Sequence, residues 1–260
     1  MDFCEASARF LSHLSLSRGV SAHTIRAYGL DINSFLAFCG TEQDAQEVLK
    51  IEAVSKRLIR RYLSHLYEGG ASTQTVLRRL SALRSFYKYA MREKLVVENP
   101  LEEIDSPKKE KRLPVSILYA QVKHLFEQPD TSDYLGFRDR AIMELFYSSG
   151  LRLSEVAGLN RRDFDAKNLV LNVFGKGKKQ RQTPITRTAA DWISRYLNHP
   201  ERHMASKEHF AEKDSQAIFL NRWGSRLNAR SIDRSFAVYL RASGLAERVT
   251  PHTIRHTIAT

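Results

Sequence analysis

Cysteine is scarce in this sequence, and the long apolar runs of membrane proteins are missing. The 260 residues include two cysteines, Cys4 and Cys39, which excludes a disulfide framework. Both lie among apolar residues of expected helices, so we expect two buried free thiols. No apolar run approaches the roughly 18 residues that span a bilayer, and the N-terminus has no secretory signal. These absences favour a soluble cytoplasmic protein that has no membrane partner.

Acidic residues are also few relative to basic ones. The chain has 41 Lys and Arg against 29 Asp and Glu, a net charge of +12 at pH 7. Its 42% of hydrophobic residues can form the core of one large domain or two ordinary ones. A folded chain this basic favours a polyanionic partner such as nucleic acid, although a basic solvated surface would give the same balance.

The first 98 residues show helical periodicity throughout. We expect a helix over residues 3–16, a second from Ser21 to Gly40, and a third that Ser55 opens and Gly69 ends. In each of the last two, serine occupies the N-cap position and glycine the C-terminal stop.

The fourth expected helix has the most regular pattern. Its apolar residues recur in alternating steps of four and three: Val76, Leu80, Leu83, Tyr87 and Ala90. The opposite face carries small and basic side chains that suit close approach to a phosphate backbone: Arg78, Ser81, Ser85, Lys88 and Arg92. A solvated face of a four-helix bundle explains this pattern equally well.

Residues 105–114 separate halves of different character. The segment DSPKKEKRLP is highly charged and has no apolar periodicity, which is typical of a linker. We therefore expect a helical domain at 1–104 and a second domain at 115–260. The predicted fold is mainly α, with a four-helix bundle followed by an α+β domain that has a small antiparallel sheet.

The second half mixes helices with short strands. Alternation at 169–173, the turn GKGKK and the return QRQTPI predict a β-hairpin with a basic tip. The apolar run at 217–220 predicts another short strand. Helices are expected at 137–149 and around 232–240, each followed by a glycine stop.

The segment SGLRLSEVAGL places Arg152 between the stop at Gly150 and a predicted N-cap at Ser154. A guanidinium beside free helix N–H groups favours phosphate binding. A surface salt bridge is the simpler interpretation.

The segment FGKGKKQRQTP brings Lys176, Lys178, Lys179 and Arg181 to the hairpin tip or just behind it. Such a tip can enter a groove or deliver one ammonium group to a leaving oxygen. It can equally be a solvated basic turn, and the pattern excludes a P-loop.

The segment TPHTIRHTIAT opens a last expected helix with Thr250–Pro251. His252 and Arg255 are three residues apart and share one side of its first turns, which suits phosphoryl binding and proton exchange. His252 and His256 have metal-ligand spacing, but no glutamate lies between them in an HExxH pattern. We therefore expect no metal.

These motifs, in this order, resemble the catalytic set of the tyrosine recombinases, the phage integrase family. The segments SAHTIRAYGLDINSFLAFC and STQTVLRRLSALRSFYKYAMREKLVVENP are similar to the SAM-like core-binding domain of the Xer branch, XerC and XerD. The resemblance extends over essentially every residue. It implies a core-binding bundle joined to a tyrosine-recombinase catalytic domain.

The resemblance implies a reaction in which a tyrosine attacks a DNA phosphodiester and forms a 3′-phosphotyrosyl link without a cofactor. Arg152 and Arg255 would hold the non-bridging oxygens. Lys176 would protonate the leaving 5′ oxygen, and His252 would handle the proton of the nucleophile. Glu155 would orient Arg152.

The implied partners are a double-stranded recombination site and a second Xer-type recombinase, in a homo- or hetero-tetramer on DNA. A DNA translocase is a further candidate partner. The implied task is chromosome dimer resolution at cell division, with plasmid or phage integration as the alternative. The expected DNA contacts are the basic face of the fourth helix together with Lys178, Lys179 and Arg181.

The sequence departs from the family after the HxxR motif, where the family has a further histidine or tryptophan and then the tyrosine. It ends at Thr260, and Tyr239 precedes HxxR and fits a buried stripe better than a nucleophile. We therefore expect a truncated chain that binds DNA but does not cleave it alone. The alternatives are a DNA-binding remnant, a type IB topoisomerase-like enzyme and an unrelated RNA-binding module.

Overall fold

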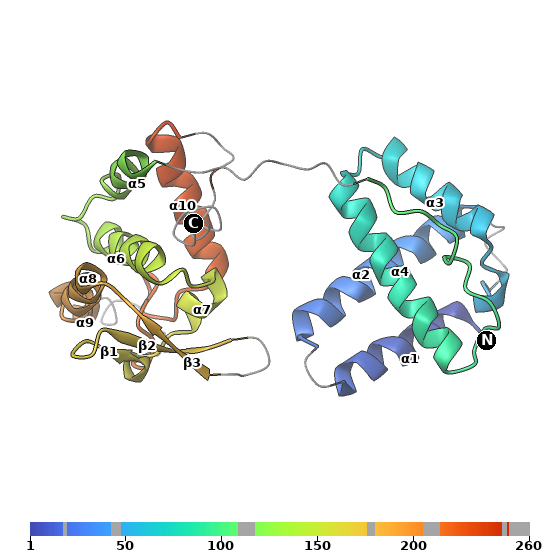
Figure 1. Cartoon of the computed structure of the whole chain (residues 1–260), viewed down its shortest axis with the longest axis horizontal. Coiled ribbons are helices and arrows are strands. Elements are labelled where there is room, and N and C mark those ends of the chain that lie inside the picture. The colour runs from blue at the N-terminus through green and yellow to red at the C-terminus, as the bar shows by residue number, and fades with distance from the viewer. Residues whose placement is uncertain are drawn as a thin grey trace. The chain divides into compact units, whose positions relative to one another are not determined.

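The computed structural model describes residues 1–17, 20–42, 48–108, 118–175, 180–204, 214–245 and 249. The chain forms two compact units (Figure 1), Met1–Arg112 and Leu113–Thr260. Each unit has its own hydrophobic core. The point of division lies in the segment where the sequence predicts a linker. Among the described residues, every helix is too short or too polar to serve as a membrane span.

The first unit is a bundle of four α-helices. They are α1 (Phe3–Leu16), α2 (Ala22–Glu42), α3 (Lys56–Glu68) and α4 (Thr73–Arg92), with a 3-10 turn η1 (Ile51–Ala53) before α3. Helix α4 packs against the other three, and its predicted apolar stripe is fully buried. Ser21, Ser55 and Ser72 each accept a backbone N–H from the third residue after them, which begins α2, α3 and α4.

Aromatic rings hold the centre of the bundle together. Phe86 of α4 lies 5.0 Å from Phe3 and 5.6 Å from Phe10, both of α1, measured between ring centroids. Phe35 of α2 lies 5.6 Å from Phe3. Packing rings in tilted pairs adds to the free energy from their burial, so this cluster ties three helices to one another.

Two details of the bundle differ from the sequence predictions. Helix α2 runs through Gly40 to Glu42, because Gly40 keeps a right-handed conformation and the buried Phe38 and Cys39 anchor the last turns. The prediction that both thiols are buried is wrong for Cys4, which is exposed on the outer side of α1. Cys39 is buried, and burial raises the pKa of its thiol to about 11.

The second unit combines helices with a three-stranded sheet. Its helices are α5 (Tyr119–Phe126), α6 (Tyr134–Ser149), α7 (Leu153–Gly158), α8 (Arg187–Leu197), α9 (Pro200–Met204) and α10 (Ala229–Ala242), with a 3-10 turn η2 (Arg161–Asp163). Helix α6 packs closely on α8 and also contacts α5, while α10 packs on α7 (Figure 1). Asp133 caps α6 by accepting the Gly136 N–H at 2.9 Å, so this helix begins three residues before the predicted start.

The predicted hairpin is confirmed and is part of an antiparallel sheet in the order β1 (Phe164–Asp165), β2 (Val170–Phe174), β3 (Gln180–Pro184). In its register Leu171 pairs with Thr183, and Val173 pairs with Arg181. Leu171 and Val173 are buried, so this face of β2 contributes to the core of the unit.

The prediction of a strand at 217–220 is wrong. Ala217 and Leu220 form isolated bridges only, to Asn160 and Arg226. The carbonyls of this apolar segment are bound by buried arginines. Arg202 donates to Ala217 and Ile218, both at 2.7 Å, and Arg138 donates to Leu220 at 2.9 Å. Because arginine side chains satisfy these backbone groups, a full strand ladder is not needed.

Candidate active site

Arg152 lies at the junction between two helices. Helix α6 ends at Ser149 and is capped by Gly150, whose φ of 57° is the left-handed conformation that glycine favours. After the buried Leu151, Arg152 occupies the N-cap position of α7. The predicted N-cap, Ser154, lies inside α7 instead, because the Glu155 carboxylate accepts the Arg152 backbone N–H at 2.8 Å. The Arg152 side chain remains 56% exposed and is therefore accessible to a ligand.

Glu155 connects Arg152 to strand β3. Its Oε1 accepts a hydrogen bond from Arg152 Nη1 at 3.1 Å. Arg181 binds the same carboxylate in bidentate fashion, Nη1 to Oε1 at 2.9 Å and Nη2 to Oε2 at 2.8 Å. The Glu155 side chain is only 5% exposed, so two guanidinium groups share one buried carboxylate.

The pairing of Arg181 with Glu155 was not predicted, although the strand pattern contained a signal for it. Arg181 and Thr183 are the inward residues of β3, and Arg181 lies opposite the buried Val173. Because outward and inward residues alternate along QRQTP, Arg181 is expected to face inward, unlike a residue of the hairpin tip. Its side chain is still 40% exposed, and the expected contact with DNA stays a prediction.

The cluster has a defined protonation state. Burial by itself would raise the pKa of Glu155, but the hydrogen bonds from Arg181 and Arg152 outweigh burial and lower the pKa to about 2. The hydrogen bonds that Arg181 donates to Glu155 in turn raise the pKa of Arg181. At neutral pH the three side chains together carry one net positive charge, which suits a phosphate.

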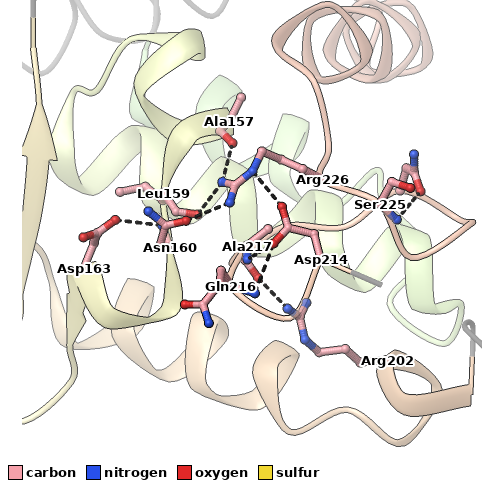
Figure 2. A network of polar contacts seen from close by, with 11 residues as sticks. Ala157, Leu159, Asn160, Asp163, Arg202, Asp214, Gln216, Ala217, Ser225 and Arg226 are labelled. Carbon is pink, nitrogen blue, oxygen red and sulfur yellow. Dashed lines mark hydrogen bonds and ion pairs between the residues drawn. The ribbon is translucent and has the colours of Figure 1, made fainter. Parts of the chain in front are cut away.

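A second arginine, Arg226, stabilises the C-terminal end of α7 through several hydrogen bonds. Arg226 donates to the carbonyls of Ala157 at 3.3 Å and Leu159 at 3.1 Å, and to Asn160 Oδ1 at 2.7 Å (Figure 2). Its Nε also binds Asp214 at 3.0 Å. These bonds satisfy carbonyls that the end of a helix leaves open, so Arg226 anchors the short helix that carries Glu155. Nothing in the sequence around Arg226 indicated this role.

The predicted basic face of α4 lies on the surface of the bundle. Arg78, Ser81, Lys88 and Arg92 are exposed and Ser85 is partly buried. Arg78 pairs with the buried Asp31 of α2, and Arg92 contacts His13 of α1 at 2.9 Å. Ser85, Lys88 and Arg92 also line a cleft of about 420 Å³ with Phe10, Tyr28 and Tyr89 among its apolar walls.

Several predicted site residues lie outside the described residues: Lys176, Lys178, Lys179, His252 and Arg255. Tyr239, which the sequence placed in a helix stripe, lies partly buried in α10 and donates a hydrogen bond to Asp139 at 3.1 Å. Burial, followed by the nearby Asp139 carboxylate, raises the pKa of its hydroxyl. In the part of the chain that the structure describes, no three His, Cys, Asp or Glu side chains form a group that could hold a metal ion.

Family comparisons cover both units. The profile described as "Phage integrase family" matches residues 116–260, and "Phage integrase, N-terminal SAM-like domain" matches residues 8–94. A protein named "Tyrosine recombinase XerC" from Chlamydia pneumoniae is 45% identical, over 96% of this chain and 83% of its own length. Another of the same name from Syntrophus aciditrophicus (strain SB) is 35% identical, over 98% of this chain and 83% of its own.

Solved structures share the fold at lower identity. The Tn1549 transposon integrase in complex with transposon right end DNA has a TM-score of 0.77 at 18% identity, covering 99% of this chain and 85% of that one. A lambda integrase dimer bound to a COC′ core site has a TM-score of 0.71 at 18% identity, covering 100% of this chain and 89% of that one. At such identities the likeness concerns the fold alone.

Proposed function

The chain belongs to the phage integrase family of tyrosine recombinases, and we propose that it is a site-specific recombinase that cuts and rejoins duplex DNA. In the proposed step a tyrosine hydroxyl attacks the scissile phosphate, forms a 3′-phosphotyrosyl bond and releases a 5′ hydroxyl. Attack by a second 5′ hydroxyl on that bond rejoins the strands and frees the tyrosine.

The proposed roles follow from charge and proton balance. Arg152 and Arg255 bind the non-bridging oxygens, where negative charge grows in the transition state. Lys176 protonates the leaving 5′ oxygen, and His252 accepts the proton of the tyrosine.

One observation supports this proposal most directly. The Arg152 guanidinium is accessible, and its backbone is fixed at the start of α7 by the buried Glu155. A cation held in place before the substrate arrives stabilises developing charge without a cost of reorganisation.

The proposed substrate is a double-stranded recombination site, bound by a tetramer that includes a second Xer-type recombinase. The DNA complexes among the structural neighbours support a duplex DNA substrate, and the names of the relatives support a Xer-type site. The exposed basic face of α4 would contact the phosphate backbone, so affinity should fall steeply with salt. The proposed task is chromosome dimer resolution at cell division.

The test is covalent capture on a nicked suicide substrate that carries a Xer-type site, read as a protein–DNA adduct on a denaturing gel. Two proteins are compared: the 260-residue chain, and a chimera continued with the C-terminal segment of the Chlamydia pneumoniae relative. We expect an adduct from the chimera. Arg152→Ala in the chimera should slow adduct formation about 100- to 1000-fold, as loss of one transition-state donor does.

The other outcomes are equally informative. An adduct from the 260-residue chain itself would mean that one of its own tyrosines is the nucleophile. Binding to the duplex without an adduct from either protein would favour a second candidate, a DNA-binding protein of this family that does not cleave. Arg255→Ala should leave duplex affinity largely intact, and a loss of binding would assign Arg255 to the docking surface instead.

A further inference from the structure

The shared carboxylate poses a problem for the candidate site. Glu155 is buried and negatively charged, and it lies within hydrogen-bond distance of the guanidinium that is proposed to attract phosphate. Left with Arg152 as its only cationic partner, it would cancel the charge of that residue. A neutral ion pair attracts a phosphate much less than a free guanidinium does.

We propose that Arg181 is a positioning residue, which neutralises Glu155 from the side of the sheet and so leaves the charge of Arg152 available to the DNA phosphate. The proposal rests on the proposed function, because it concerns the same phosphate site.

The contact geometry supports this division of roles. Arg181 gives Glu155 two side-chain hydrogen bonds, at 2.9 and 2.8 Å, whereas Arg152 gives it one, at 3.1 Å. A bidentate pair is the stronger and more directional of the two arrangements. Of the two guanidinium groups, that of Arg181 therefore binds the carboxylate more closely, while Arg152 keeps more than half of its side chain exposed.

The backbone on each side of the cluster is well anchored. Arg181 pairs across the sheet with Val173, which is 1% exposed in the core. Glu155 lies in α7, and it also accepts the backbone N–H of Arg152. The three side chains thus connect the hairpin to the turn that presents Arg152, and this defines their relative positions before any substrate binds.

The test uses single-turnover adduct formation by the chimera, with Arg181→Gln, Glu155→Gln and the double variant. Arg181→Gln should slow adduct formation about 10- to 100-fold at saturating DNA, because the unpaired carboxylate then neutralises Arg152. Adding Glu155→Gln should restore most of the rate, because glutamine keeps an acceptor oxygen without the charge. Arg181→Lys should be intermediate, since it keeps the charge but loses the bidentate contact.

Two controls separate this mechanism from others. Arg162→Gln removes an exposed arginine from η2 and should leave the rate unchanged. The dissociation constant for the duplex, measured in parallel, should change less than about threefold in Arg181→Gln, because one partly screened charge contributes little to total affinity. A double variant as slow as Arg181→Gln would overturn the proposal, as would a loss of rate explained by weaker DNA binding.

A measurement without DNA separates this proposal from the proposed function. The pKa of the Glu155 carboxyl group, followed through the chemical shift of its carboxyl carbon by NMR, should rise in Arg181→Gln towards the ordinary range of glutamate. A titration that does not move overturns the assignment of Arg181, whether or not the chimera cleaves. A titration that moves, with no adduct from the wild-type chimera, supports the charge pairing and overturns the proposed function instead.

Discussion

The two units bury their polar residues in different ways. Among the described residues, the buried polar side chains of the bundle are Ser7 and Asp31. Those of the second unit are more numerous and all charged: Arg138, Asp139, Glu155, Asp163 and Arg202. The bundle consists mainly of long helices that satisfy their own backbone, so its core is built mainly from apolar stripes. The second unit contains short elements and irregular segments, whose carbonyls need side-chain donors.

This contrast can be measured because both tryptophans, Trp192 and Trp223, belong to the second unit. Tryptophan fluorescence therefore follows the second unit, while helical circular dichroism follows both. Urea unfolding recorded with the two probes can assign each change in free energy of unfolding to one unit.

The largest effect is expected from the apolar core of the bundle. Phe86→Ala removes a fully buried ring and should lower the free energy of unfolding by about 4 kcal/mol. The loss should shift the unfolding transition recorded by circular dichroism and leave the transition recorded by tryptophan fluorescence unchanged. The control is Met91→Ala on the exposed side of α4, with an effect below about 0.5 kcal/mol. An equal shift of the tryptophan transition would show that the two units unfold together.

The corresponding change in the second unit removes a buried arginine. Arg202→Met should cost about 3 kcal/mol, because the carbonyls of Ala217 and Ile218 lose their donor in a buried segment. In this variant the unfolding transition recorded by tryptophan fluorescence should shift to lower urea concentration. Arg9→Met, which breaks an exposed ion pair with Glu5, is the control in the bundle and should cost less than about 0.5 kcal/mol. A small effect of Arg202→Met would mean that the irregular segment does not depend on this arginine.

Acid should affect the second unit through Glu155. Its pKa is lowered from 4.5 to about 2 on folding, so its stabilisation is fully present above pH 4.5 and is lost as pH falls towards 2. Over that pH window, we expect the free energy of unfolding of the wild type to fall by about 1–3 kcal/mol more than that of Glu155→Gln. Glu5→Gln, at an exposed ion pair of the bundle, should change the acid response by less than about 0.5 kcal/mol. Identical acid profiles for wild type and Glu155→Gln would contradict the pairing with Arg181.

The smallest change in free energy of unfolding is expected from the loss of a helix cap, and it should be of the same size in both units. Ser72 caps α4 and Thr186 caps α8, each by accepting a backbone N–H at 3.3 Å. Ser72→Ala and Thr186→Ala should each cost about 1 kcal/mol, since capping is local and does not depend on how a core is built. The matched controls are Ser72→Thr and Thr186→Ser, which keep a capping hydroxyl. A much larger loss at Thr186 would show that its cap also supports the packing of α8 on α6.

The fold was predictable where the interactions are close in sequence. The stripe of α4, the serine caps of α2 and α3, the glycine after α6 and the hairpin all involve residues a few positions apart, and the structure confirms them. The prediction failed at 217–220 because its partners are side chains distant in sequence, and at Gly40 because packing overrides a weak stop signal. For the candidate site, the contact of Arg152 with Glu155 spans three residues and could be foreseen. Strand alternation indicates that Arg181 faces inward, but it does not identify a partner that lies 26 residues away.

The sequence by itself predicted the mainly helical fold, because periodicity and caps are local properties of a chain. Its short motifs carried the resemblance to the family, from which the candidate catalytic residues were proposed. Only the tertiary structure decided which charges meet. Arg181 with Glu155, Arg226 with the end of α7, and Arg202 with the carbonyls near Ala217 are all brought together by packing of distant segments. The physical reason is that a charged side chain in water needs no partner, and only burial forces it to find one.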